Sequence, residues 1–445
     1  MLSSTATRTT SRRRSVPCSR VPSVTHWGRF STTPARRRPD PCQRRRPPIA
    51  QAPPSATIDR MRGYEQEADE AFREFKGARR FPALDGLRAL SILMVLTVHM
   101  HDPFMWDFFN GSFGVTMFFC ISGFLITTLL LREEDANGRV SLRGFYIRRV
   151  FRILPLYLLA LVLATVLVLG FGLGSGGDTF LQRLPLLATF NGEFAGSGTF
   201  SHSWSLGIEE KFYILWPLLA FGVPFVRSHI GAVLGVLLPA ALAAAFIEPV
   251  AYFGIYMPII GGCALAVAMH HRRSFGVVFA LARPWIGASL FVVMLIMSEL
   301  SGSLPWKEAI GYAHVTFAVA VLLALPGTLI GKAWPRRLLS LRPVVFYGQL
   351  AYGIYLFHPF VGEVVDMFAA PGSESVPQIL ARFIAMFVGS FALAWVLKIS
   401  VEDPMISLGR RLARASRSRA PVPAAAASIL DQGAGRENPQ TSGQG

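Results

Sequence analysis

Apolar stretches of about twenty residues recur along the chain, separated by short polar segments. They lie near residues 84–102, 111–131, 150–173, 205–226, 230–247, 250–269, 278–298, 311–330, 344–368 and 377–400. A helix needs about 20 predominantly apolar residues to cross a bilayer. The pattern therefore predicts an all-α polytopic membrane protein with about ten transmembrane helices. Because proline can also kink a single membrane helix, Glu248-Pro249 leaves open whether one span or two pass there.

The basic residues between these stretches predict the orientation. If the N-terminus is cytoplasmic, the loops on the cytoplasmic side hold nearly all of the loop arginines and lysines, and the opposite loops hold only Arg183 and Lys307. Short cytoplasmic loops are enriched in Lys and Arg. We therefore expect both termini in the cytoplasm, which requires an even number of spans. The one long external segment is residues 174–204, rich in Gly and Ser.

Composition supports a membrane protein and argues against a chain of two or three soluble domains. Hydrophobic residues make up 52% of the chain and charged residues 16%, with a mean hydropathy of +0.41. Average soluble domains carry about 25% charged residues. The four cysteines lack the spacing of metal ligands, and no metal is predicted.

Both ends of the chain differ in composition from the apolar middle. Residues 1–80 form an Arg/Ser/Pro-rich extension that we expect to be disordered, and residues 409–445 a disordered tail, which leaves 81–408 as the transmembrane domain. The basic extension could bind nucleic acid or resemble a transit peptide. No folded module accompanies the charge, so we expect no nucleic-acid partner. Met61 offers an alternative start.

The first predicted helix carries three ionisable residues, Asp85, Arg88 and His99. Ionisable residues within a membrane helix are costly and are functional candidates by default. Arg88 and His99 are eleven residues apart, so they project from one face, about 20° apart around the helix and roughly 16 Å apart along it. Alternatively, Arg88 reaches the headgroups and His99 hydrogen-bonds between helices.

A second cluster joins arginines and aromatic residues in the stretch from Phe145 to Tyr157. Arg148 and Arg152 are four residues apart and should share a helix face, with Tyr146 nearby. Arginines beside aromatic rings suit a nucleotide, through bidentate hydrogen bonds to phosphate and stacking on the base. For Arg149, the positive-inside pattern alone is a sufficient explanation.

A third cluster, residues 202–217, contains Trp204, Ser205 and the adjacent carboxylates Glu209 and Glu210. The acids either cap a helix N-terminus, or they make Glu209 a site acid or the residue that orients a catalytic histidine. Farther along, His358 lies in another apolar stretch. It is either a functional group or a buried structural histidine.

Together these motifs resemble acyltransferase family 3. The resemblance is carried by residues 84–88 through His99, Phe118–Ile126, Phe145–Pro155, Trp204–Tyr213, Tyr352–His358 and Glu402–Pro404. Ala351 departs from the family, which often has Ser there. An extracellular esterase-like domain, which some members append, is not expected.

The resemblance implies ten helices in a bacterial inner (plasma) membrane and transfer of an acyl group from acetyl-CoA or a related acyl-CoA. The acceptor would be a carbohydrate such as lipopolysaccharide, exopolysaccharide, a peptidoglycan sugar or a glycosylated small molecule. In that scheme Arg88, Arg148, Arg152 and Tyr146 bind the donor, and Trp204, Ser205 and His358 the acceptor. His99 is the general base or the nucleophile, and Glu209 assists it.

Two other classes of function remain open. A transporter or flippase of lipid-linked sugars would also have many helices and intramembrane charges, although such proteins usually show an internal repeat, and none is visible. A non-catalytic component of polysaccharide export would not need Arg88 and His99 on one helix face. The acceptor, the acyl length and the oligomeric state do not follow from the sequence.

Overall fold

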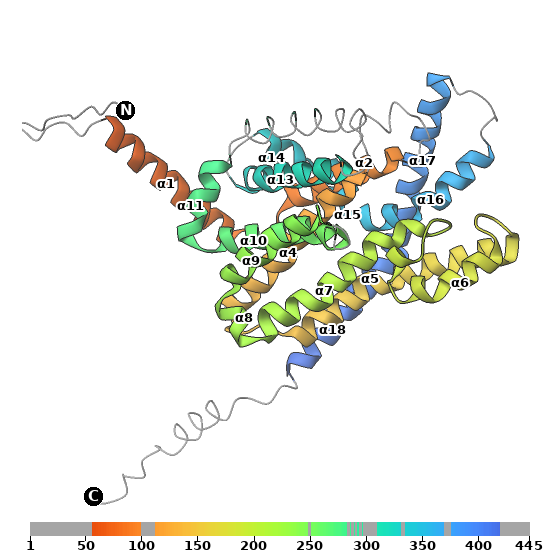
Figure 1. Cartoon of the computed structure of the whole chain (residues 1–445), viewed down its shortest axis with the longest axis horizontal. Coiled ribbons are helices and arrows are strands. Elements are labelled where there is room, and N and C mark those ends of the chain that lie inside the picture. Colours follow the sequence, from red (N-terminus) through yellow and green to blue (C-terminus); the bar gives the residue numbers. More distant parts are fainter. Residues whose placement is uncertain are drawn as a thin grey trace, which may run out of the picture. The chain divides into compact units, whose positions relative to one another are not determined.

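A computed structural model describes residues 56–98, 112–247, 251–282, 309–330, 334–368 and 375–418, with a few isolated positions between 285 and 296. These residues form helices joined by short connections, and the described parts contain no strand. Figure 1 shows the arrangement. The described part of the chain is thus all-helical, as the apolar pattern predicts.

The helices follow one another along the chain with these bounds. They are α1 (Ala56–Gly77), α2 (Pro82–Val98), α4 (Ser112–Asn137), α5 (Leu142–Thr165) continued by η1 (Val166–Gly170), α6 (Gly177–Ala188), η2 (Gly192–Phe194), η3 (Ser201–Ser203), α7 (Trp204–Gly222), α8 (Pro224–Ser228), α9 (Ile230–Ala244), η4 (Ala251–Tyr256), α10 (Met257–His270), α11 (Arg272–Leu281), α13 (Ala309–Leu329), α14 (Trp334–Leu339), α15 (Arg342–Gln349), α16 (Ala351–Met367), α17 (Val376–Leu397), η5 (Lys398–Glu402) and α18 (Asp403–Ser418).

Four helical segments are long and apolar enough to cross a membrane. They are Ser112–Asn137, Leu142–Gly170, Tyr252–His270 and Val376–Ser416, and the bent pair α15–α16 would make a fifth. These spans are those of a multi-pass membrane protein. Helices also occupy the other predicted stretches, except that most of 278–298 lies outside the described residues. Ten spans and cytoplasmic termini stay predictions.

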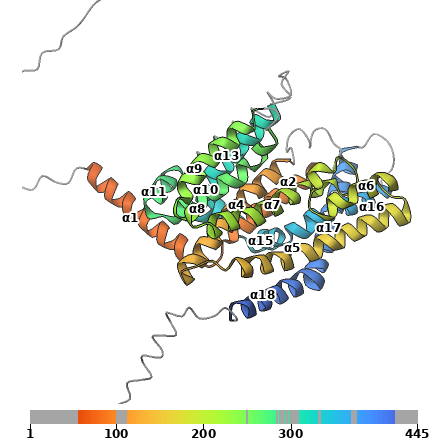
Figure 2. The same ribbon diagram turned by 60° about the horizontal axis from the view of Figure 1, so that its bottom comes forward.

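Helix α4 lies at the centre of the packing, against α2, α7, α10 and α13. Figure 2 shows α9, α10 and α13 grouped beside it. Glycines bring α4 and α10 close together, because a Cβ on Gly123 would collide with the carbonyl oxygen of Ile259, and one on Gly262 with that of Cys120. Small residues at helix interfaces allow this approach of backbones in membranes.

A broken helix forms one wall of the site. The axes of α15 and α16 differ by 67° on either side of Leu350. Helix α15 packs along α2, where a Cβ on Gly348 would collide with the carbonyl oxygen of Asp85. Irregular backbone at membrane depth is tolerated where it is buried in protein or lines a cavity. The break between α15 and α16 lines a cavity.

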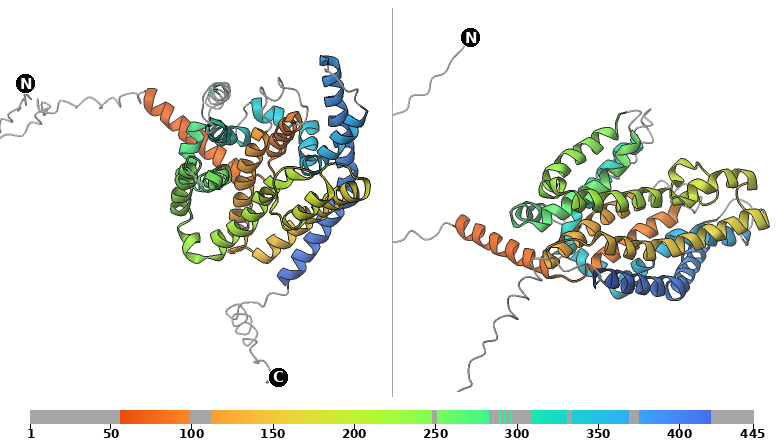
Figure 3. Two further views of the ribbon diagram at one scale, coloured as in Figure 1. Left: turned by 45° about the vertical axis from the view of Figure 1, so that its right-hand side comes forward. Right: turned by 90° about the horizontal axis from the view of Figure 1, so that it is seen from below.

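The structure differs from the expected disorder at both ends of the domain. Helix α1 occupies part of the expected N-terminal extension, and it buries Ala68, Ala71 and Phe75 on one face. Figure 3 shows it beside α11, where Phe72 packs against Phe275. Helix α18 extends to Ser418 and packs along α5. Both segments are polar in overall composition, so the sequence did not indicate that they form packed helices. Each helix packs through a single apolar stripe, which a mostly polar composition hides.

Candidate active site

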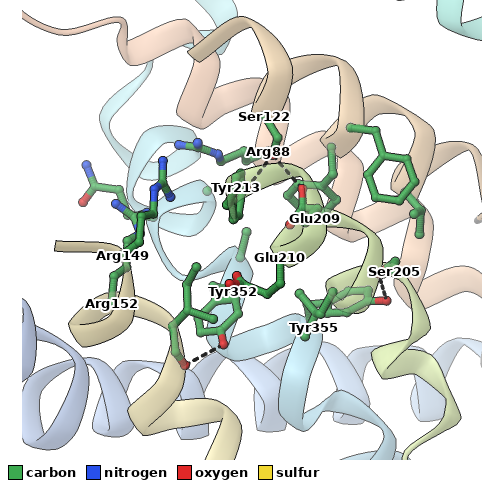
Figure 4. A pocket seen from close by; sticks show the side chains of 18 residues that line it. Arg88, Ser122, Arg149, Arg152, Ser205, Glu209, Glu210, Tyr213, Tyr352 and Tyr355 are labelled. Carbon is green, nitrogen blue, oxygen red and sulfur yellow. Dashed lines mark hydrogen bonds between the residues drawn. The ribbon is translucent and has the colours of Figure 1, made fainter. Parts of the chain in front are cut away.

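A small cavity lies where α2, α4, α5, α7 and the α15–α16 break meet (Figure 4). Its volume is about 90 Å³. We call it the inner cavity. Its polar lining consists of three arginines, two glutamates, one glutamine, and serine and tyrosine hydroxyls. Such a concentration of ionisable groups between apolar helices is the mark of a functional site in a membrane protein.

Arginines form one side of the inner cavity. Arg149 and Arg152 come from α5, three residues apart and hence on one face, and Arg88 comes from α2. Arg88 is held by an ion pair to Asp85, with 2.9 Å between Nη1 and Oδ1. The guanidinium of Arg149 lies over the ring of Tyr213, 4.7 Å from its centre. Arg152 forms no hydrogen bond or ion pair within the described part of the chain, and it lies within electrostatic reach of the Glu402 carboxylate.

Carboxylates and hydroxyls lie beside these arginines. Ser122 Oγ donates to Glu209 Oε1 at 2.6 Å, and Tyr213 OH donates to Ser122 Oγ at 3.0 Å. Glu210 also lines the cavity (Figure 4). Charges of both signs within one small enclosure lower the cost of burying either. The relay from Tyr213 through Ser122 holds the Glu209 carboxylate in one orientation.

Tyrosines of α16 close the remaining wall. Tyr355 OH donates to the backbone oxygen of His202 at 2.5 Å and lies 2.6 Å from Ser205 Oγ. Because the tyrosine proton is committed to His202, Ser205 must donate to Tyr355. Tyr352 OH donates to the backbone oxygen of Ile153 at 2.9 Å. These bonds fix the start of α16 against α5 and the loop before α7.

A second and larger cavity adjoins the first, with a volume of about 310 Å³. We call it the vestibule. The two share Arg88, Arg152, Gly348 and Gln349 among their lining residues. The vestibule is basic, with six cationic side chains against two acids. These are Arg79, Arg80, Arg88, Arg132, Arg152 and Lys398 against Asp85 and Glu402.

The structure brings together four of the residues predicted from the sequence. Arg88, Arg152, Ser205 and Glu209 all line the inner cavity. His99, the predicted base or nucleophile, lies outside the described residues. Within those residues no group of three His, Cys, Asp or Glu side chains could hold a metal ion.

The other four predicted residues are not among those that line the inner cavity or the vestibule. Arg148 forms an ion pair with Glu133, with 3.0 Å between nitrogen and oxygen, and Tyr146 OH donates to the backbone oxygen of Ile214 at 2.7 Å. Trp204 packs edge-on against Phe119. His358 is fully buried, with Nδ1 2.7 Å from the backbone oxygen of Tyr355.

Sequence reasoning missed seven polar lining residues, which are Ser122, Arg149, Glu210, Tyr213, Gln349, Tyr352 and Tyr355. Arg149 had a usable signal, since spacings of three and four residues share a helix face equally well. Glu210 was visible as half of an acidic pair. The tyrosines lay within recognisable motifs, but their direction depends on how the helices pack.

The chain is similar in sequence to a known protein family and to individual known proteins. The family described as "Acyltransferase domain" (Acyl_transf_3) matches residues 81–398. The chain is 30% identical, over 75% of its length, to the Bacillus subtilis protein named "Putative peptidoglycan O-acetyltransferase YrhL", and covers 56% of that protein. It is 26% identical, over 73% of its length, to "Peptidoglycan O-acetyltransferase OatA" of Listeria monocytogenes, and covers 55% of it. The chain thus spans little more than half of these relatives. No solved structure matches it.

Proposed function

Because the chain belongs to the acyltransferase family whose domain matches residues 81–398, we propose that it transfers an acetyl or similar acyl group from acyl-CoA to a hydroxyl of a cell-envelope carbohydrate. The reaction exchanges a thioester for an ester. The hydroxyl oxygen of the acceptor attacks the thioester carbonyl carbon, the carbon–sulfur bond breaks, and the acceptor proton ends on the CoA thiol.

The observation that carries the proposal is the pairing of a basic vestibule with an inner cavity that holds both arginines and carboxylates. A phosphorylated donor needs cations where its nucleotide binds, and the vestibule has a net positive lining. The inner cavity is too small for a nucleotide but has room for the end of an extended chain. Arg88 and Arg152 belong to both, so a donor bound in the vestibule would present its thioester to the inner cavity.

The acceptor hydroxyl needs a group that takes its proton. His99 is proposed for this role from the sequence resemblance, either as general base or as a nucleophile that carries the acyl group on its ring. Glu209, held by Ser122, would orient the acceptor or the imidazole. Arg149 and Arg88 would stabilise negative charge on the carbonyl oxygen as the hydroxyl attacks. Peptidoglycan is one candidate acceptor, since the relatives are named for it.

The test is thiol release by the purified protein supplied with acetyl-CoA and a carbohydrate acceptor. We expect free CoA and sugar ester in equal amounts, and no turnover by His99→Ala, with His358→Ala as a comparison at a buried histidine outside the cavity. An acyl-enzyme trapped without acceptor would identify a nucleophile, and its absence a general base. If the wild type leaves acetyl-CoA intact with every envelope carbohydrate tried, the proposed function is wrong.

The acceptor can be named in whole cells. Envelope glycans from strains with and without the gene would be compared by mass spectrometry. We expect an ester-linked acyl mass to be lost on the true acceptor when the gene is removed. Identical glycan spectra from the two strains would contradict transfer to the cell envelope.

A further inference from the structure

Two adjacent arginines precede the first predicted span and lie outside the family match. Arg79 and Arg80 occupy the linker between α1 and α2, and both line the vestibule. Both side chains are exposed, and neither forms an ion pair or hydrogen bond within the described part of the chain. They therefore place two uncompensated positive charges beside a basic cavity.

Several ionic groups around this linker form ion pairs. Glu74 pairs with Arg336 at 2.6 Å, and Lys76 pairs with Asp135 at 2.7 Å. On the far side of the vestibule, Lys398 pairs with Asp403 at 2.8 Å. A cleft lined by charge of one sign raises the local concentration of counter-ions. The unpaired charges of Arg79 and Arg80 beside the vestibule therefore favour an anionic ligand.

The linker is held firmly in place by Arg132 of α4. Its guanidinium donates to the backbone oxygens of Ala78 and Phe75, at 2.6 and 2.5 Å, and lies over the ring of Phe81, 4.6 Å from its centre. The first two contacts satisfy carbonyl groups at the end of α1 that would otherwise lack partners. Arg79 and Arg80 thus project from a segment fixed on both sides, so binding an anion would order little additional backbone.

The vestibule has the size of a ligand site. Its volume of about 310 Å³ falls at the lower end of the roughly 300–1,000 Å³ typical of such pockets, which the inner cavity does not reach. Of its six cations, Arg132 is occupied by backbone oxygens, and Arg88 and Lys398 by carboxylates. The cations without a hydrogen bond or ion pair to the described part of the chain are Arg79, Arg80 and Arg152, and of these only Arg152 has a carboxylate, Glu402, within electrostatic reach.

We infer that the Arg79-Arg80 linker is the subsite that holds the nucleotide phosphates of the acyl donor, with Arg152 continuing the path to the inner cavity. This inference rests on the proposed function for the identity of the donor. Arginine suits the task because its planar guanidinium can donate two parallel hydrogen bonds to one phosphate. The linker binds the donor, and the residues of the inner cavity act on its thioester.

Calorimetry with adenosine 3′,5′-bisphosphate tests the subsite without requiring turnover, because this probe carries nucleotide phosphates but no thioester. For the full chain with Arg79→Gln and Arg80→Gln combined, we expect Kd to rise about tenfold, as for two exposed charge contacts of modest strength. Replacement of both arginines by lysine should restore part of the affinity. The matched control combines Arg62→Gln with Arg73→Gln, which removes the same charge from exposed positions of α1 and should bind as wild type.

Bisphosphate binding by the Arg79/Arg80 double variant that equals the wild type would overturn the inference. So would a wild-type protein that consumes acetyl-CoA but does not bind the bisphosphate. With acetyl-CoA as substrate, the double variant should raise KM and leave kcat unchanged. If no preparation consumes acetyl-CoA, the proposed function fails, while the titration still reports on the linker.

Phosphate could also come from a lipid headgroup, and nanodiscs separate the two sources. The bisphosphate would be titrated in discs with and without phosphatidylglycerol. Equal affinity in the two supports a nucleotide subsite. Loss of bisphosphate binding in the anionic discs would assign the two arginines to lipid and refute the inference.

Discussion

At the residue scale, neighbouring arginines on α5 occupy different environments. Arg149 lines the inner cavity over the ring of Tyr213, whereas Arg148 is paired with Glu133 and lies away from it. A charge held beside the reacting carbonyl stabilises developing negative charge far more than one that is already neutralised elsewhere. Of these two arginines, only Arg149 is therefore placed to act on the thioester of the proposed donor.

Replacing each of these arginines by methionine separates their roles. Arg149→Met should lower kcat about a hundredfold, the usual scale for loss of one group that stabilises an oxyanion. Arg148→Met should leave kcat within a few-fold of wild type. Steady-state thiol release from acetyl-CoA measures both. Equal losses in the two variants, or a larger loss in Arg148→Met, would contradict this assignment.

The residues of the site could be predicted from sequence only in part. Intramembrane charge identified Arg88, and the acidic pair identified Glu209. Arg148 and Arg149 could not be separated, because helical spacing places either one near Arg152 and only the position of Glu133 decides between them. The tyrosines of α16 were missed as site residues because the 67° break determines where they point.

At the element scale, a buried ion pair connects the segment before α7 to α7 itself. Glu193, whose side chain is only 4% exposed, pairs with Lys211 of α7, and Tyr252 OH donates to the same carboxylate at 3.2 Å. Lys211 also donates to the backbone oxygen of Phe190 at 2.9 Å. Because Lys211 follows Glu209 and Glu210 on the same helix, the pair helps to fix where those carboxylates point.

Reversing the two charges tests whether this ion pair holds the segment before α7 in place. Breaking a buried ion pair by removing one partner costs roughly 3–5 kcal/mol. Glu193→Lys and Lys211→Glu alone should therefore each lower the melting temperature and reduce turnover. The two combined should recover part of both, as the pair is restored with its charges exchanged. A double variant no better than the worse single variant would show that the pair does not act as a unit.

The contact of α15 with α2 depends on Gly348. A methyl group there would collide with the carbonyl oxygen of Asp85, next to the Arg88 that spans both cavities. Gly348→Ala should cost about 1–3 kcal/mol of stability and reduce turnover through displacement of α2. Gly362→Ala is the control, since a Cβ there meets only Met386 at an ordinary 3.7 Å. If the two variants unfold at the same temperature and release thiol at the same rate, the contact between Gly348 and α2 matters for neither stability nor turnover.

The sequence was most informative about the positions of the long helices. Apolar stretches located the long helices because a membrane span must be continuously apolar, whatever its neighbours. It could not locate α1 or α18, whose polar composition hides one packed stripe, or the break at Leu350. Those features depend on contacts with distant parts of the chain, such as the bonds from Arg132 to the end of α1.

At the scale of the whole molecule, the orientation in the membrane decides from which side the donor arrives. The distribution of arginines predicts cytoplasmic termini, which would place Arg79, Arg80 and the vestibule on that side as well. With the four native cysteines replaced by serine, single cysteines introduced at Arg62 and Arg410 should react with an impermeant thiol reagent only in inside-out vesicles. One at Thr189 should react only in intact cells or right-side-out vesicles. Labelling of all three from one side would overturn the topology.

The vestibule and the inner cavity together would make one route for the proposed donor. Arg79 and Arg80 stand at its outer part, Arg88 and Arg152 at the junction, and Glu209 at its inner end. This order matches the order of groups along an acyl-CoA, with phosphates first and thioester last. The shared residues are the reason for treating two cavities as a single site.

Cryo-electron microscopy of the protein with a thioether analogue of acetyl-CoA measures this route directly. We predict phosphate density beside Arg79 and Arg80, a chain passing between Arg88 and Arg152, and the acetyl end near Glu209. Analogue bound with its nucleotide outside the vestibule, or with its acetyl end away from the inner cavity, would contradict the single route.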